Sequence, residues 1–321
     1  MFKINRYNSL DESIWDDFVP NSNNGTIFHL RSFLNYHPKN RFQDHSLIIM
    51  KKGKLFSVFP AAVKTINGRL SLISHPGTTV GSFVVPENLS IAESMDLVQS
   101  LVDYAKKNSL YSIRITLPPN LYQGRLSNYM DFSFFKHGFQ YLKRDITSIL
   151  FLEESHEATV HKFRPSHRRA VKKAIDSGIE IKQSNDVKSF YKILEKNLKI
   201  RHGVNPTHTL EELQYIHSLF PNRCNLFAAL LNKKMIAGVF NFIVNEHVVL
   251  AFYISHDEKF AEYRAVNLLF YKIFDWAIDQ KYKIYDFGTF TVNEEPNMGL
   301  GRFKENFGAS GIFRDTIELV I

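Results

Sequence analysis

The feature that most constrains the fold is the order of apolar and polar segments between residues 226 and 308. This stretch reads as two strands joined by a tight polar turn, then a third strand, a helix and a closing strand. The expected elements are strands at 226–231, 235–244 and 247–255, a helix from about 264 to 280, and a strand at 284–288. This order is typical of a mixed sheet that packs a helix against one face.

A similar order occurs in the N-terminal half of the chain. Two apolar runs flank the turn Lys51-Lys52-Gly53-Lys54, which predicts a second hairpin, and a predicted helix and strand follow it. These elements are the hairpin at 46–63, the helix at 91–107, with Leu97, Leu101, Val102 and Ala105 at helical spacing, and the strand at 111–115. We therefore expect two copies of one fold, in domains covering residues 1–152 and 153–321. The expected fold class is α/β (α+β). No low-complexity linker separates the two domains, so the halves should pack closely.

The bulk composition sets broad limits. The 321 residues are 44% hydrophobic and 22% charged, as in ordinary globular proteins, and carry a net charge of +8. The positive excess favours anionic partners such as nucleotides, RNA or lipid surfaces, although a generic basic surface explains it equally well. Cys224 is the single cysteine, which excludes an internal disulfide. The N-terminal residues lack the apolar core of a signal peptide, and no apolar run approaches about 20 residues, so we expect a cytoplasmic protein.

The densest charge cluster lies between residues 162 and 175. Pro165 suits the first turn of a helix and Gly178 its end. The pairs Arg168 with Lys172 and Arg169 with Lys173 are each four residues apart and share a helix face, so they repel each other unless an anion compensates. Arg164, Arg168, Arg169 and Lys172 are therefore candidates for binding phosphates, and a solvated helix face is the alternative.

Three residues in the C-terminal half could carry chemistry. Asp286 sits inside an aromatic strand, where it is either a hydrogen-bonded structural residue or a base. Lys304 lies between Phe303 and Phe307. These aromatic rings could anchor the segment and aim the Lys304 ammonium at a carbonyl oxygen; the alternative is an exposed lysine beside core aromatics. Tyr253, on the strand expected at 247–255, could orient a substrate or pack in the core.

Other candidates carry weaker signals. His75 lies in the hydroxyl-rich turn at 74–81, which could line a substrate site or be a plain loop. Arg201 follows an amphipathic helix, at 187–198, and could lie near a substrate. Cys224 has no neighbouring His or Asp at the spacing of a nucleophile, and we expect it to be inert. The histidines show no metal-binding motif, so we expect no metal site.

Together these segments resemble the FemABX aminoacyltransferases and the broader GNAT-like acyltransferases. The most specific motifs are Tyr285-Asp286-Phe287-Gly288 and Gly301-Arg302-Phe303-Lys304-Glu305-Asn306-Phe307-Gly308, with the basic helix at 162–178 beside them. In the N-terminal half the resemblance rests on Trp15 with Phe28-His29, the hairpin ending at Phe59-Pro60, and the turn at 74–81.

The resemblance implies two tandem GNAT-like domains, each a mixed, mostly antiparallel sheet flanked by helices, and transfer of an acyl group to an amine. Lys304 matches the family's lysine near the reacting carbonyl, and Arg164, Arg168 and Arg169 match its basic region near phosphates. Two features depart from the family. No coiled-coil arm is present, and the segment 253–265 has no glycine where acetyl-CoA enzymes carry a glycine-rich loop.

The sequence therefore predicts an acyltransferase that uses aminoacyl-tRNA or an acyl-CoA as co-substrate and no tightly bound cofactor. The acceptor is expected to be an amine of a cell-envelope precursor or a sugar nucleotide. Lys304 would stabilise the oxyanion, Asp286 or a water would take the proton, and Tyr253 would orient the substrate. Lys304→Ala is then expected to abolish transfer without lowering the melting temperature. The alternative is a non-catalytic GNAT-like module that binds a nucleotide, tRNA or envelope component. Neither reading involves DNA, and the oligomeric state stays open.

Overall fold

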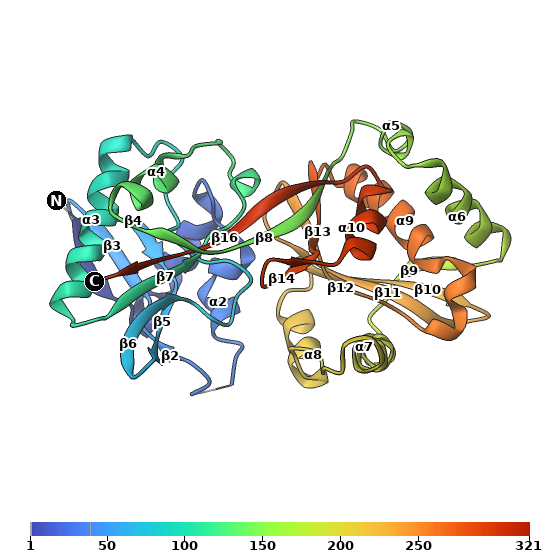
Figure 1. Ribbon diagram of the computed structural model, residues 1–321, viewed down its shortest axis with the longest axis horizontal. Helices are drawn as coiled ribbons and strands as arrows, with labels where there is room; N and C mark the ends of the chain where they lie inside the picture. The colour runs from blue at the N-terminus through green and yellow to red at the C-terminus, as the bar shows by residue number, and fades with distance from the viewer. Residues whose placement is uncertain (1, 39) are drawn as a thin grey trace. The chain divides into compact units, whose positions relative to one another are not determined.

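The computed structural model describes residues 2–38 and 40–321, except for the side chains of residues 201 and 202. The chain divides into two compact units, unit 1 with Met1–Asp145 and Phe313–Ile321, and unit 2 with Ile146–Ile312 (Figure 1). The sequence placed one boundary between residues 152 and 153. The units instead divide inside the long strand β8 (Gln140–Phe151), and the last strand, β16 (Ser310–Val320), ends in unit 1. β16 belongs there because it pairs antiparallel with a strand of unit 1.

Unit 1 contains two sheets, one ordered β1-β3-β4 and one ordered β2-β5-β6-β7-β16. Its strands are β1 (Phe2–Arg6), β2 (Gln43–Asp44), β3 (Leu47–Lys51), β4 (Lys54–Phe59), β5 (Ala61–Ile66), β6 (Arg69–Ser74) and β7 (Ser112–Thr116), and its helices are α1 (Glu12–Phe18), α2 (Arg31–Leu34), α3 (Ile91–Lys107) and α4 (Tyr129–Lys136). The predicted hairpin forms as β3 and β4. Pro60 ends its second strand because proline cannot donate a ladder hydrogen bond, and the chain continues as β5 in the other sheet.

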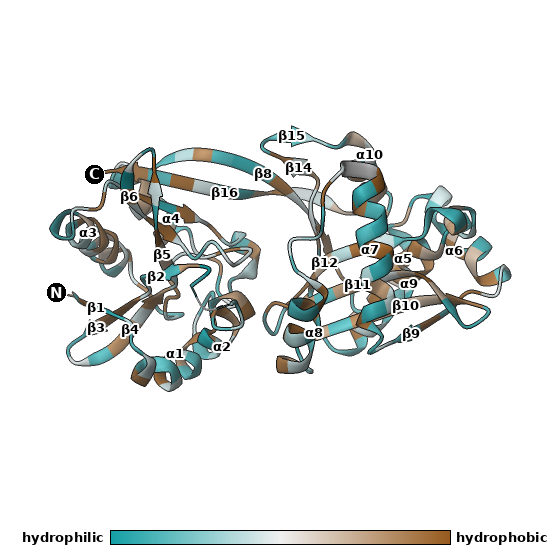
Figure 2. Ribbon diagram, turned by 90° about the horizontal axis from the view of Figure 1, so that it is seen from below, coloured by the Kyte–Doolittle hydropathy of each residue, from teal (hydrophilic) through white to brown (hydrophobic). Residues whose placement is uncertain are grey.

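Unit 2 has a main sheet with the order β8-β13-β12-β11-β10-β9 and a separate two-stranded sheet of β14 and β15. Its strands are β9 (Glu180–Gln183), β10 (Cys224–Leu231), β11 (Lys234–Ile243), β12 (Val248–His256), β13 (Ile284–Thr289), β14 (Thr291–Val292) and β15 (Glu295–Pro296), and its helices are α5 (His156–His161), α6 (Pro165–Asp176), α7 (Val187–His202), α8 (Leu210–Leu219), α9 (Ala265–Asp279) and α10 (Met298–Glu305). Helices α6, α9 and α10 lie on one face of the sheet, and α7 and α8 on the other (Figure 1). Helix α7 carries both hydrophilic and hydrophobic residues along its length, as a surface helix should (Figure 2).

The two units repeat one supersecondary pattern. In unit 1, α3 connects β6 to the parallel strand β7, with Leu72 opposite Ile113. In unit 2, α9 connects β12 to the parallel strand β13, with Val248 opposite Ile284. Most other strand pairs are antiparallel. Short turns join β3 to β4, β5 to β6, β10 to β11 and β11 to β12, whereas pairs such as β7 with β16 come from distant parts of the chain. The predicted fold class, tandem mixed sheets flanked by helices, is confirmed.

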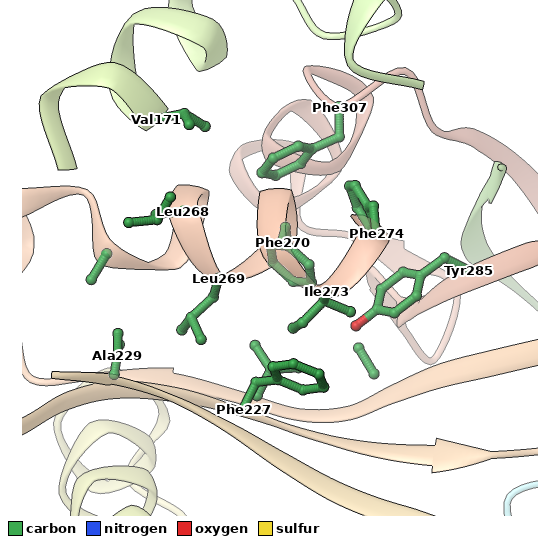
Figure 3. Close-up of a cluster of buried hydrophobic side chains, with 14 of the residues drawn as sticks. Val171, Phe227, Ala229, Leu268, Leu269, Phe270, Ile273, Phe274, Tyr285 and Phe307 are labelled. Carbon is green, nitrogen blue, oxygen red and sulfur yellow. The ribbon is translucent and has the colours of Figure 1, made fainter. Parts of the chain in front are cut away.

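The core of unit 2 lies between α9 and the sheet. Leu269 and Ile273 point from α9 toward Phe227 on β10, while Phe270 and Phe307 pack above them (Figure 3). Removing one such aromatic side chain costs about 3–5 kcal/mol of folding free energy. The helix is therefore fixed firmly on its strands, and its N-terminal end has a defined place beside β12. Among the described residues, none of the helices combines the length and apolarity that crossing a bilayer would require.

Candidate functional site

Strands β12 and β13 of unit 2 part after a short parallel ladder. They pair over three positions, from Val248 with Ile284 to Leu250 with Asp286. β12 continues to His256, held on its other side by β11. Beyond this point the two strands do not pair with each other in the described chain. From this position on, the backbone N–H and C=O groups on the facing edges of β12 and β13 are not paired with each other, although both strands lie inside the sheet.

A β-bulge lies next to the point of separation. Phe240 on β11 pairs with Tyr253, whereas Asn241 pairs with Ala251, so Phe252 is an extra residue on β12. A bulge leaves the ladder locally disrupted and its extra residue unpaired. A backbone N–H freed in this way is the kind of fixed dipole that can stabilise negative charge on a carbonyl oxygen.

Asp286 and Lys304 meet at Gly288, at the end of β13. The Asp286 carboxylate is fully buried and accepts hydrogen bonds from the Thr147 hydroxyl and from the Gly288 N–H at 2.7 Å. The Lys304 ammonium is 1% exposed and donates to Gly288 O at 2.6 Å and Thr289 O at 2.9 Å. Gly288 has φ +76°, a conformation that favours glycine. Both charged groups are thus desolvated and held by backbone.

Tyr253 is fixed by a histidine that the sequence analysis did not single out. The Tyr253 hydroxyl accepts from the His208 backbone N–H at 3.4 Å and lies 3.0 Å from His208 Nδ1. Burial is the main cause that raises the pKa of Tyr253, so the phenol stays protonated near neutral pH. The phenol and the imidazole are thus hydrogen-bonded, and the imidazole tautomer sets which of the two donates.

Asp286 and Tyr253 lie on the same face of the sheet. Tyr285 and Phe287 pack into the core beneath α9, so strand alternation turns Asp286 to the opposite face. Tyr253 contacts His208, immediately before α8, which covers that face (Figure 1). Leu250, the register partner of Asp286, is three residues from Tyr253, or roughly 10 Å along the strand. The structure thus brings Asp286 and Tyr253 to the strand separation.

The predicted basic helix exists as α6, and its cations differ in their surroundings. Arg164, Arg169 and Lys172 are exposed. Arg168 Nη1 donates to Phe163 O at 2.8 Å and to His161 O at 3.4 Å. Arg168 also lines a groove of about 340 Å³ between α5, α6 and α9. All four candidate cations are therefore exposed, and Arg168 differs only in its hydrogen bonds to the backbone.

The first turn of α9 lies near one unpartnered donor of the described chain, Asn267 Nδ2, and one unpartnered imidazole nitrogen, His167 Nε2. Arg264 begins the helix with φ +58°, and the helix's first N–H groups have no intrahelical acceptor. Asn267 Nδ2 and His167 Nε2 are buried without a hydrogen-bond partner among the described residues. Burial, and to a smaller extent the charge of Arg264, lower the pKa of His167 to about 4, although a hydrogen bond to the Phe303 backbone opposes them. The neutral ring donates to that backbone from Nδ1, which leaves Nε2 as an acceptor. A helix N-terminus with such neighbours is suited to an anion.

The remaining sequence candidates have different positions. His75 belongs to unit 1 and is buried, with Nδ1 accepting from Gly77 N–H at 3.2 Å, and burial lowers its pKa to about 4. The side chain of Arg201 lies outside the described part of the chain. Cys224 is buried, and burial raises the pKa of its thiol.

Three residues with site contacts escaped the sequence analysis, namely Thr147, His208 and Asn267. Each is polar and isolated in an apolar stretch or a loop, so no spacing pattern marks it. A buried polar residue reveals its role only through partners that are distant in sequence. In residues 2–38 and 40–321, no group of three or more His, Cys, Asp or Glu side chains is arranged to hold a metal ion.

Comparisons with known proteins agree with this architecture. A protein-family model of the acetyltransferase (GNAT) domain matches residues 161–305. No curated protein matches the sequence significantly. Among solved structures, FemX superposes with a TM-score of 0.76 at 14% identity, covering 99% of this chain and 97% of FemX.

Two further structures are similar over most of their length. The tandem GNAT protein from the clavulanic acid biosynthesis pathway has a TM-score of 0.57 at 9% identity, with 100% of this chain and 98% of that chain covered. L-PGS from Bacillus licheniformis has a TM-score of 0.56 at 11% identity, with 86% and 83% covered. At these identities the likeness concerns the fold. Residues 161–305 therefore match the acetyltransferase (GNAT) domain model, and the whole chain resembles FemX in fold.

Proposed function

We propose that this protein is a cytoplasmic acyltransferase whose transfer site lies in unit 2, where β12 and β13 separate. The observation that carries the proposal is the coincidence of the strand separation, the bulge at Phe252 and the polar groups of Tyr253 and Asp286. An acyl carbonyl placed there would meet a backbone N–H outside the ladder. The GNAT-family match over residues 161–305 includes all of these elements.

The reaction is attack of a substrate amine on the activated carbonyl of the donor. The new bond joins the amine nitrogen to the carbonyl carbon, and the bond from that carbon to the donor's sulfur or oxygen breaks. Asp286, or a water beside it, takes the amine proton, and Tyr253 orients the substrate. Lys304 stabilises the oxyanion electrostatically from its place at Gly288, with the bulge N–H as the direct donor.

The donor is an aminoacyl-tRNA or an acyl-CoA, and both carry phosphates. Arg264, Asn267 and the first N–H groups of α9 are placed to bind one phosphate group. Exposed Arg169 and Lys172 on α6 extend the positive surface next to it, since α6 packs against α9. The acceptor is an amine of a cell-envelope precursor or a sugar nucleotide. FemX and L-PGS share the fold, which supports the envelope assignment without identifying the molecule.

The test is a transfer assay with radiolabelled acetyl-CoA and a mixture of radiolabelled aminoacyl-tRNAs, each supplied with an amine-bearing envelope precursor or amino-sugar nucleotide. We expect product with one donor class, and a loss of at least tenfold in kcat/KM for Tyr253→Phe, which keeps the ring and removes the hydroxyl. Tyr271→Phe on α9 is the matched control and should retain activity. Equal activity of Tyr253→Phe and wild type would refute the role of Tyr253, and no transfer from either donor class would refute the function.

A specific observation favours a second function, binding without transfer. Lys304 and Asp286 are both buried and bonded to the protein's own backbone. A non-catalytic module could keep these groups only for stability. Thermal-shift measurements with acyl-CoA, tRNA and a sugar nucleotide separate the two functions, because a binding module is stabilised by a ligand that it never converts.

A further inference from the structure

Unit 1 contains a small polar cavity that plays no part in the proposed transfer. Its volume is about 40 Å³, slightly more than the roughly 30 Å³ that one water occupies. Four segments enclose it: the residues after the first helices at Asn23 and Asn24, the stretch before α3 that includes Ser82, the loop after β7, and helix α4. All four segments belong to the same compact unit.

One carboxylate in this cavity lacks a cationic partner. Asp131, on α4, accepts a hydrogen bond from Asn120 Nδ2 at 3.0 Å on its Oδ2 atom, and it forms no ion pair with the described residues. Asp315 faces it from β16, but that carboxylate is paired with Arg144 at 3.0 Å. Burial and, to a smaller extent, the charge of Asp315 raise the pKa of Asp131, although the bond from Asn120 opposes them. A partly buried carboxylate without a counter-charge is costly, and a cationic ligand would remove that cost.

The other charged groups of the cavity leave this imbalance in place. Arg125 lines the cavity, yet its Nη1 atom donates to the backbone oxygen of Glu87 at 3.5 Å. Glu87 also lines the cavity, and its side chain is exposed to solvent. Asp131, Glu87 and Arg125 together carry a formal charge of −1. This is the opposite of the whole chain, which carries +8.

The wall beside Asp131 is held in a fixed arrangement. Gln123 Nε2 donates to Asn120 Oδ1 at 3.1 Å, and Asn23 Nδ2 donates to Gln123 Oε1 at 3.3 Å. Asn23 also receives the Arg125 backbone N–H at 2.7 Å. These amides satisfy one another, so the carboxylate of Asp131 is the strongest acceptor left for a ligand. A wall whose bonds are already made is preorganised for binding.

The cavity combines this acceptor with apolar surface. Leu117, Met130 and Phe134 line it beside the polar groups. Ser82, with φ +84°, also lines the cavity, and its hydroxyl is a second acceptor for a ligand beside Asp131. Apolar walls with a few convergent polar groups are typical of small-molecule sites. Methylene groups fit the apolar part, and a compact hydrogen-bond donor fits the acceptors.

We propose that this cavity binds the ammonium end of a primary alkylamine, with Asp131 as the counter-charge and Leu117, Met130 and Phe134 around the adjoining methylenes. An ammonium has three donors and is about as large as a water, so it suits a space of roughly one water-sized group better than a planar guanidinium does. The ligand class is thus a lysine-like aminoalkyl chain. The proposal is independent of acyl transfer, since it uses residues of unit 1 only.

The test uses three probes that share a three-carbon chain, on the full-length protein: n-propylammonium, 1-propanol and propionate. Isothermal titration at neutral pH and constant ionic strength should show saturable binding of n-propylammonium and at least tenfold weaker binding of the other two. Asp131→Asn should reduce binding of n-propylammonium at least tenfold. Asp103→Asn, at an exposed position on α3, is the matched control and should bind as wild type does.

Folding of the variant does not limit this test. Asp131→Asn removes a carboxylate that has no ionic partner, so the free variant should melt at the same temperature as wild type or higher. The comparison of the three probes on the wild-type protein needs no variant at all. Equal binding of n-propylammonium and 1-propanol, unchanged binding by Asp131→Asn, or no saturable binding by wild type would each overturn the proposal.

Discussion

Replacing Lys304 with methionine tests whether this buried lysine holds unit 2 together. Methionine has a similar length but no ammonium, so the change removes the donor and keeps most of the packing. In the structure the ammonium donates to Gly288 O at 2.6 Å and Thr289 O at 2.9 Å, and the side chain is 1% exposed. Both carbonyls would lose these bonds in a place that water does not reach. The variant should therefore be less stable, contrary to the sequence-based expectation of an unchanged melting temperature.

The size of the effect follows from the two lost bonds. A hydrogen bond to a charged group contributes about 1.5–3 kcal/mol, and breaking a buried charged arrangement typically costs about 3–5 kcal/mol. We therefore expect Lys304→Met to lower the unfolding free energy by about 3–5 kcal/mol. In a unit of this size each kcal/mol shifts the melting temperature by roughly 2–4 °C, which gives a decrease of roughly 6–20 °C.

Differential scanning calorimetry measures this shift directly. Lys272→Met is the matched control, because Lys272 lies on α9 in the same unit, is half-exposed and approaches Asp275 only at 3.9 Å. Such an exposed pair contributes about 0–1 kcal/mol, so the control should melt within a few degrees of wild type. If Lys304→Met melts together with the control, the two carbonyl contacts do not stabilise the unit. If it also loses transfer at that unchanged stability, the lysine acts in the chemistry alone.

Three further outcomes follow from the structure. Gly238→Ala should lower the unfolding free energy measured in urea by about 1–3 kcal/mol, because a Cβ there would lie 2.6 Å from the Phe190 ring. In the control Gly299→Ala the nearest atom lies 3.5 Å from the new Cβ, so this variant should keep its stability. Equal stabilities of the two variants would contradict the prediction. Burial lowers the pKa of His29 from 6.5 to about 4. Between these two pH values His29 is protonated in the unfolded chain and neutral in the folded chain. Stability should then fall as the pH drops from 6.5 to 4, by up to about 3 kcal/mol, and His29→Gln should flatten this slope in urea titrations at several pH values. Cys224 is 2% exposed, and burial raises its thiol pKa, so Ellman's reagent should label it only at the rate of unfolding; rapid labelling of folded protein would contradict that.

The periodic elements could be predicted from the sequence because their signals are local. The helix expected at 91–107 is α3 with the same bounds, and the helix expected at about 264–280 is α9 (Ala265–Asp279). In both, apolar residues recur at helical spacing and face a sheet. The hairpin at 226–244 is also present as β10 and β11, since a polar turn between two apolar runs fixes the pairing.

Long-range pairings could not be predicted. β16 and β7 lie about two hundred residues apart in the chain, and no pattern within either strand names its partner. This pairing places the last residues of the chain in unit 1, which a single cut at 152/153 did not anticipate. The partner of Tyr253 is likewise distant in sequence, because His208 lies in a loop with no motif around it.

The sequence by itself determined the strand and helix order, the repeated pattern and the family resemblance, because hydrophobic periodicity and turn residues act over a few neighbours. Only the tertiary structure decided what the charged residues do. It buried Lys304 and Asp286 at Gly288, left Arg169 and Lys172 in solvent, and placed Asp131 in a cavity without a counter-charge. The physical reason is desolvation: the energy of a charge depends on which groups replace its water, and those groups come from distant parts of the chain.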